Sequence, residues 1–237
     1  TGIKANINFE KKYNNLSAGR SKINILNNYF KINYLFKNNL LNIFKSDFRN
    51  KNITMAFESL ISFSPFFEAE TNLHIKKVDK EFIYNFDLEK IINKKLLLKN
   101  LNNKNKIIYN NKLKRDDIFK SHILNIDLAY GRLNFLSNTS FSGGEVNCKA
   151  DSTLIDEYPR LIFSCFFKFK DINKFSKQYS LNKKFEKDTL NLSVTGSINL
   201  LNKKISFKKI IIDETKTMNE EDLQFYKESF ENILFNK

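Results

Sequence analysis

The sequence has few of the residues that mark metal sites or catalytic centres. Its 237 residues include 2 Pro, 6 Gly, 2 Cys and 2 His, and Trp is absent. No His-x-His, His-Glu-x-x-His or Cys-x-x-Cys pattern occurs, so the sequence predicts no metal site. Catalysis needs converging polar groups, and His74 and His122 belong to no recognisable motif. We therefore expect no enzymatic activity, no catalytic residue and no cofactor.

The sequence also lacks a long apolar run. No stretch approaches the roughly 18 consecutive apolar residues of a membrane span, and no signal peptide is present. The chain starts with Thr1, and we expect it to be a fragment of a longer protein. Residues 1–237 form a single β-rich segment on this interpretation. Sub-units 1–115 and 116–237, each with strands followed by a helix, are an alternative division.

Basic residues are abundant: 40 Lys and Arg stand against 26 Asp and Glu, a net charge of +14. Such a charge is compatible with binding to nucleic acid or to anionic lipid head groups. The lysines are scattered, however, and Arg, the better reader of bases and phosphates, is rare. We therefore interpret the basic residues mainly as part of a solvated surface, and we expect no nucleic acid partner.

Alternation with a period of two dominates the chain and predicts strands. It occurs in residues 21–27, 30–36, 41–43, 53–63, 67–75, 124–135, 161–169, 190–200 and 205–212. Each strand has an apolar side and a side of Asn, Ser, Thr and Lys. The sequence therefore predicts a mainly β (α+β) fold, an elongated, twisted antiparallel sheet of successive hairpins with about three inserted helices.

Three aspartates follow strands and precede a helical pattern. Asp79 is expected to cap a helix within residues 80–101, with Ile92 and Leu96 on its apolar side, before a polar connection to about residue 117. A short helix is expected after Asp171. The switch after Asp213 is less clean, and the final helix begins instead at Asn219, a residue type that caps helices. Its apolar side contains Leu223, Tyr226, Phe230 and Ile233.

The two cysteines are placed to face each other. If residues 148–165 form an antiparallel hairpin with its turn at Asp156 and Glu157, paired residue numbers sum to 313, and Cys148 lies opposite Cys165. A disulfide at this position is typical of an oxidising compartment such as a periplasm. Two reduced, buried cysteines acting as small apolar residues are the alternative. Titration of free thiols in the denatured, unreduced protein distinguishes the two.

Three phrases carry a resemblance to a known family: "NITMAFESLISFSPFFEAETNLHIKKVD", "HILNIDLAYGRLNF" and "TLNLSVTGSINLLNKKISFKKIIID". Their long alternating strands and short Asn, Gly and Lys turns resemble the AsmA-like proteins of the bacterial envelope, related to TamB and to the repeating β-groove lipid-transfer class. The resemblance implies a segment in the periplasm, attached to the inner membrane by an N-terminal anchor outside this fragment. It also implies an apolar groove that shields acyl chains between membranes.

On this interpretation the chain takes part in phospholipid transport or outer-membrane homeostasis, with phospholipid as its partner. The residues expected to contact acyl chains are Phe57, Ile61, Phe63, Phe67, Leu73, Leu192, Val194 and Ile198. A closed β-rich scaffold or interaction domain, in which the same residues form a sealed core, is the main alternative. A basic nucleic-acid-binding module is a third hypothesis. Whether the helices cover the apolar sides of the strands decides between the first two hypotheses.

Overall fold

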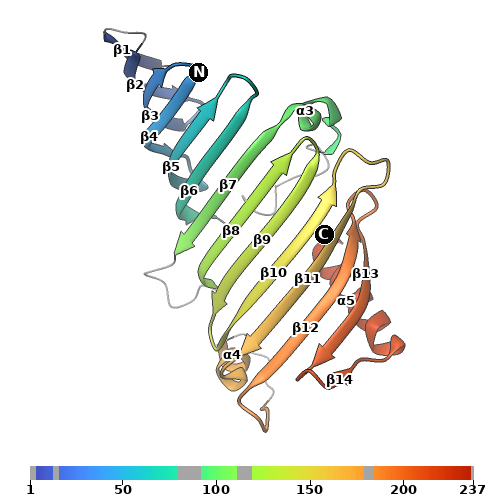
Figure 1. The fold of residues 1–237 in the computed structure, drawn as a ribbon. Helices are drawn as coiled ribbons and strands as arrows, with labels where there is room; N and C mark the ends of the chain where they lie inside the picture. Colours follow the sequence, from blue (N-terminus) through green and yellow to red (C-terminus); the bar gives the residue numbers. More distant parts are fainter. Residues whose placement is uncertain (1–3, 13–15, 80–91, 111–118, 179–183, 236–237) are drawn as a thin grey trace.

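The structure, a computed structural model, describes residues 4–12, 16–79, 92–110, 119–178 and 184–235. They form one long twisted sheet of fourteen strands, in which spatial order follows sequence order (Figure 1). At about 4.8 Å between neighbouring strands, such a sheet is about 60 Å across. The strands are β1 (Lys4–Lys12), β2 (Leu16–Ile25), β3 (Asn28–Lys37), β4 (Leu40–Arg49), β5 (Ile53–Ser62), β6 (Glu68–Val78), β7 (Asn102–Asn110), β8 (Phe119–Ala129), β9 (Arg132–Phe141), β10 (Gly144–Thr153), β11 (Arg160–Phe169), β12 (Leu190–Asn199), β13 (Lys204–Ile212) and β14 (Lys216–Thr217). The predicted mainly β class is confirmed.

The pairing corrects one detail of the prediction. Strands β6 and β7 are parallel, so the sheet is mixed and not wholly antiparallel. Parallel neighbours cannot be joined by a tight turn, and the long segment between Val78 and Asn102 connects them. Short turns join several of the antiparallel pairs, as at Asn38–Asn39 and Tyr130–Gly131, whose residues have positive φ, whereas the connection from β11 to β12 contains a helix. Asn and Gly tolerate positive φ, which matches the twist of the flanking strands.

Strand β7 lies where the sequence predicted a polar connection. Its sequence, NNKNKIIYN, is rich in Asn and Lys, which are depleted in strands. Its two neighbours determine its conformation, because Ile107 is in register with Leu73 of β6 and with Leu124 of β8. Pairing on both sides therefore overrides the weak local preference.

The described residues contain three helices, α3 (Lys95–Asn100), α4 (Ile172–Gln178) and α5 (Glu220–Phe235). The predicted cap at Asn219 is confirmed, and Asp171, after which a short helix was predicted, is a cap as well. The Asp171 carboxylate accepts a hydrogen bond from the backbone N–H of Lys174 at 2.7 Å, and the Asn219 side-chain oxygen accepts one from the N–H of Asp222 at 2.8 Å. Such bonds satisfy N–H groups that have no partner within the helix.

The other two aspartates behave differently. The helix expected directly after Asp79 falls on residues 80–91, outside the described residues. In α3, Leu96 is 80% exposed and Leu98 is 1% exposed, so the expected placement of Leu96 on the buried side was wrong. Asp213 does not start a helix. It has positive φ in the turn after β13, and its carboxylate accepts a hydrogen bond from the N–H of Asn191 at 2.9 Å.

Candidate functional site: the apolar face of the sheet

One row of side chains crosses nine strands on a single side of the sheet. Residues in register on neighbouring strands project to the same side. The partners run in order from Phe57 on β5 through Leu73, Ile107, Leu124, Ser137, Cys148, Cys165 and Val194 to Ile210 on β13. We call the side of the sheet that carries this row the apolar face.

The row one residue along the chain lies on the opposite side, the polar face. It runs from Glu58 through Asn72, Lys106, Asn125, Leu136, Lys149, Ser164 and Thr195 to Lys209. Leu136 is its one apolar member. The alternation seen within single strands therefore adds up to a two-sided sheet, because the register preserves it from strand to strand.

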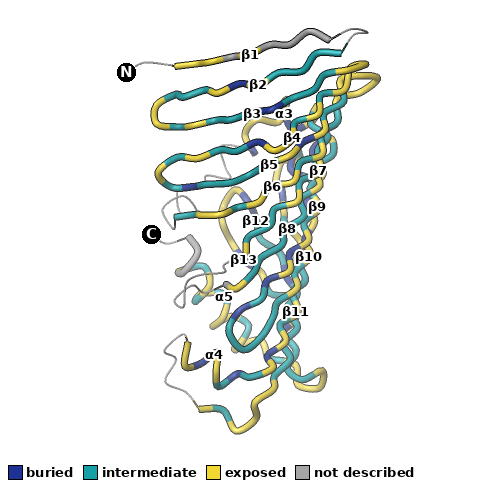
Figure 2. The backbone as a smooth tube through the Cα atoms, turned by 90° about the vertical axis from the view of Figure 1, so that its left-hand side faces the viewer, coloured by how far each residue is buried: buried dark blue, intermediate teal, exposed yellow. Residues whose placement is uncertain are grey.

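All three helices pack on the apolar face of β8 to β13, which we call the covered half. Near one end of these strands, Leu98 of α3 packs in a cluster that includes Leu128 and Ile198. Near the other end, Ile172 of α4 packs with Phe141 and Phe169. On α5, the ring of Phe230 lies 5.7 Å from that of Phe207 on β13. Figure 2 shows α4 and α5 on the same side of the nearly edge-on strands.

Strands β2 to β6 form the open half. In the part of the chain that the structure describes, the packing partners of the helices lie elsewhere, and Ile53 is the one fully buried apolar side chain of these strands. The remaining apolar side chains are shielded only partly, by their neighbours on the sheet. They include Ile23, Phe30, Ile32, Phe36, Leu41, Ile43, Phe48, Met55, Phe57, Ile61, Leu73 and Ile75.

The structure divides the eight residues predicted to contact acyl chains into two groups. In the open half, Phe57 and Leu73 are cross-strand partners, and Ile61 lies on the same face. Leu192 and Val194 lie on β12, seven strands from β5, a separation of about 30 Å along the sheet. The sequence did not reveal this separation, because strand order is a tertiary property.

The remaining three residues differ in their surroundings. Phe63 and Phe67 lie in the connection between β5 and β6 and are 50% and 42% exposed. Their rings are 6.1 Å apart, and the Phe63 ring is 6.3 Å from that of Phe36 on β3. This aromatic group is part of the open half. Ile198 instead is partly buried and packs against the cluster of Leu98, so protein side chains already cover part of it.

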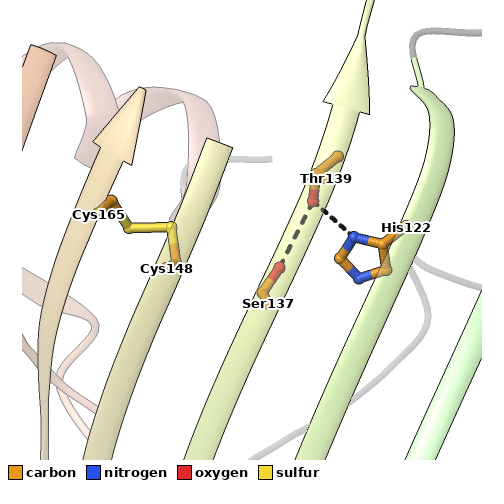
Figure 3. Close-up of a disulfide and its surroundings, with 5 residues drawn as sticks. All are labelled: His122, Ser137, Thr139, Cys148 and Cys165. Atoms are coloured by element: carbon orange, nitrogen blue, oxygen red, sulfur yellow. Dashed lines mark hydrogen bonds between the residues drawn. A yellow bond between two sulfur atoms is a disulfide. The ribbon is translucent and has the colours of Figure 1, made fainter. Parts of the chain in front are cut away.

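The two cysteines lie in the covered half, as cross-strand partners in the predicted register. Their Cα atoms are 4.1 Å apart and their sulfur atoms 2.11 Å apart, in a disulfide that joins β10 to β11 (Figure 3). The bond lies in the middle of the apolar row, between Ser137 and Val194. It therefore links two central strands on the side of the sheet that the helices cover.

A polar group on the apolar face was missed from the sequence. His122 lies within β8 rather than before it, and its Nδ1 is 2.7 Å from the Thr139 hydroxyl oxygen (Figure 3). That hydroxyl lies 3.5 Å from the hydroxyl oxygen of Ser137. Burial lowers the pKa of His122 from its ordinary value of 6.5. The parity of Leu124, Ile126 and Leu128 could have placed His122 on this face.

The described residues contain neither a metal-binding cluster nor a membrane-spanning helix. Among them, no group of three or more His, Cys, Asp or Glu side chains is arranged to hold a metal ion. No described helix has the length and apolar character needed to cross a membrane. The feature that remains is the apolar face itself.

Comparison with known proteins gives no further assignment. No family model matches the chain, and neither a curated protein nor a solved structure with significant similarity was found.

Proposed function

We propose that this chain is a non-enzymatic segment of a bacterial cell-envelope protein that shields phospholipid acyl chains on the apolar face of its open half. The observation that carries the proposal is that the described helices cover one half of the apolar face and not the other. The apolar rows continue from β2 to β13, yet the described helices pack only on the covered half. Exposed apolar surface of this extent is costly in water, and an acyl chain covers it without requiring polar partners.

The proposed contact residues are those of the open half, Phe57, Ile61, Phe63, Phe67 and Leu73. Leu192 and Val194 remain secondary candidates, because their half of the sheet carries helices. Ile198 is left out, since its neighbours already form a packed cluster.

The proposed location is the periplasm, with attachment to the inner membrane through a region outside this fragment. A disulfide between central strands supports an oxidising compartment. The resemblance of the strand phrases to AsmA-like proteins supports a role in phospholipid transport or outer-membrane homeostasis. An elongated sheet with one apolar face is the form that such a role needs.

Native mass spectrometry and lipid extraction of the purified chain test the proposal. Phospholipid should be recovered with the native sequence and lost with Leu73→Asp, which puts a charge on the apolar face. Leu60→Asp is the matched control, because Leu60 is 46% exposed and its partners Asn42 and Glu70 place it on the polar face. Recovery of no phospholipid, or equal loss from both variants, would contradict the proposal.

A closed scaffold domain is the second candidate, and the covered half favours it. There the helices and sheet already bury Leu98, Phe141 and Phe169, as a sealed core requires. The scaffold hypothesis predicts a chain that is free of lipid when purified. The same experiment therefore distinguishes the two functions.

A further inference from the structure

A second feature lies on the polar face, at the opposite side of the sheet from the proposed lipid contact. A hollow of about 570 Å³ is lined by residues of β1 to β5. Four of its lining residues are basic, Lys4, Lys22, Lys31 and Arg49, and Asp47 is the one acidic residue. The basic residues are dispersed over the first 49 positions of the sequence, and strand pairing brings them together. We call this feature the basic hollow.

The positive charge of the basic hollow exceeds the negative charge that the described residues place beside it. Lys22 is the direct cross-strand partner of Lys31, an arrangement of like charges that destabilises a sheet. Asp47 is next in register, but its carboxylate is 3.3 Å from the Lys76 amino group. Within the described part of the chain, no ion pair joins a basic residue of the hollow to an acidic one.

Another hollow on the same face shows that this imbalance is not general. It has a volume of about 860 Å³ and is lined by residues of β8 to β13. There Asp127 and Asp151 accompany Lys149, Lys208 and Lys209. Two acidic side chains accompany three basic ones in that hollow, whereas one accompanies four in the basic hollow.

We propose that the basic hollow binds the phosphate groups of anionic phospholipid headgroups at a membrane surface. The guanidinium of Arg49 lies 4.9 Å from the centre of the Tyr29 ring, a contact that positions it beside the lysines. Arg binds phosphate oxygens through paired N–H groups, and Lys binds them as a point charge. The volume lies within the range of about 300–1,000 Å³ typical of ligand sites, so it has room for more than one phosphate.

The observations favour a lipid surface over nucleic acid. Single-stranded nucleic acid is held by aromatic side chains on which bases stack. Three aromatic residues, Tyr29, Phe30 and Phe48, line the hollow. Phe30 and Phe48 are cross-strand partners in the parity of the apolar face, and the Arg49 guanidinium already lies over the Tyr29 ring. The proposal is independent of acyl-chain shielding, because the basic hollow and the apolar face are on opposite sides of the sheet.

Co-sedimentation with lipid vesicles tests the proposal. The native chain should bind vesicles of phosphatidylcholine mixed with phosphatidylglycerol and not vesicles of phosphatidylcholine alone. Lys22→Glu combined with Arg49→Glu should weaken binding by about tenfold or more, since each basic residue near an anionic surface contributes to attraction. Lys208→Glu combined with Lys209→Glu changes the net charge equally and should retain binding. Equal weakening by both pairs would show a net-charge effect and overturn the proposal.

Two further measurements make the result decisive. The neutral pair Lys22→Gln and Arg49→Gln also removes the like-charge contact between Lys22 and Lys31, and we expect it to fold and still to lose affinity for anionic vesicles. Native-like binding by this folded variant would overturn the proposal. A labelled single-stranded oligonucleotide is the competing ligand. Tighter binding to the oligonucleotide than to anionic vesicles, abolished by the same pair, would likewise overturn the assignment to a lipid surface.

Discussion

The open and covered halves of the sheet have the same alternation of apolar and polar residues but different surroundings. In both, side chains such as Leu73 and Val194 project from the same face. In the covered half, α3, α4 and α5 convert that face into packed clusters. In the open half, no described helix does so. The difference shows that alternation predicts which side of a strand is apolar but does not determine what covers it.

The comparison also assigns the two hypotheses from the sequence to different parts of the molecule. The sealed-core hypothesis fits β8 to β13, where Phe141 and Phe169 are buried. The acyl-shielding hypothesis fits β2 to β6, where none of the described helices packs against Phe57 or Leu73. The two hypotheses therefore concern different halves of one sheet.

The largest expected effect is on the free energy of unfolding, when the same Leu→Ala substitution is made in each of the two halves. Leu98→Ala should lower the free energy of unfolding by about 4 kcal/mol, since it leaves a cavity in a packed cluster. Leu73→Ala should cost about 1 kcal/mol, because the side chain is only half-buried and solvent can fill the space. Urea unfolding of both variants measures the difference. Equal losses would show that the open half is packed like the covered one.

Removal of the disulfide should be the next largest effect. Cys148→Ala combined with Cys165→Ala should lower the free energy of unfolding by about 3 kcal/mol, the cost expected for a loop of this length. The native chain should show a lower Tm in reductant, and the double variant should show the same Tm with and without it. An unchanged Tm of the native chain in reductant would contradict a stabilising role of the bond.

Loss of a helix cap should have a smaller effect on the covered half. Asp171→Ala removes the acceptor for the Lys174 N–H and should cost about 1 kcal/mol. Asp171→Asn is the control, since Asn caps helices nearly as well. Both are measured by urea unfolding. If Asn were as destabilising as Ala, the contribution of Asp171 would have to be its charge rather than its hydrogen bond.

The smallest expected effect is a pH dependence from His122. Burial lowers the pKa of this residue in the folded state. Below a pH of about 6.5 the unfolded chain therefore binds more protons at this residue than the folded chain does. Its contribution to stability is therefore complete above the ordinary pKa and declines as the pH falls towards the folded value. Urea unfolding over this range should show a smaller decline for His122→Asn. An identical decline would contradict this assignment.

Much of the fold follows from the sequence, because strand parity and helix caps are local. The alternation around Leu124 and Leu192, and the caps at Asp171 and Asn219, depend on neighbours within a few residues. Strand β7 was missed because pairing with β6 and β8 overrides the weak strand preference of Asn and Lys. Leu96 was misplaced because the side of α3 that packs on the sheet is set by tertiary contact.

The candidate site was predictable in kind but not in extent. The residues of the apolar face could be chosen from parity, as Phe57 and Val194 show. Which of them remain uncovered depends on where α3, α4 and α5 pack, and a pattern within one strand does not contain this information. The basic hollow was missed for the same reason, since strand pairing is what brings Lys4, Lys22 and Arg49 together.

Photocrosslinking to co-purified phospholipid tests the central claim most directly. A photoreactive amino acid is placed at Phe57 on the apolar face, at the adjacent Glu58 on the polar face, or at Phe207 beneath α5 in the covered half. Lipid adducts should form from position 57 and not from positions 58 or 207. Adducts of equal yield from positions 57 and 58, or none from position 57, would contradict an open apolar face that shields acyl chains.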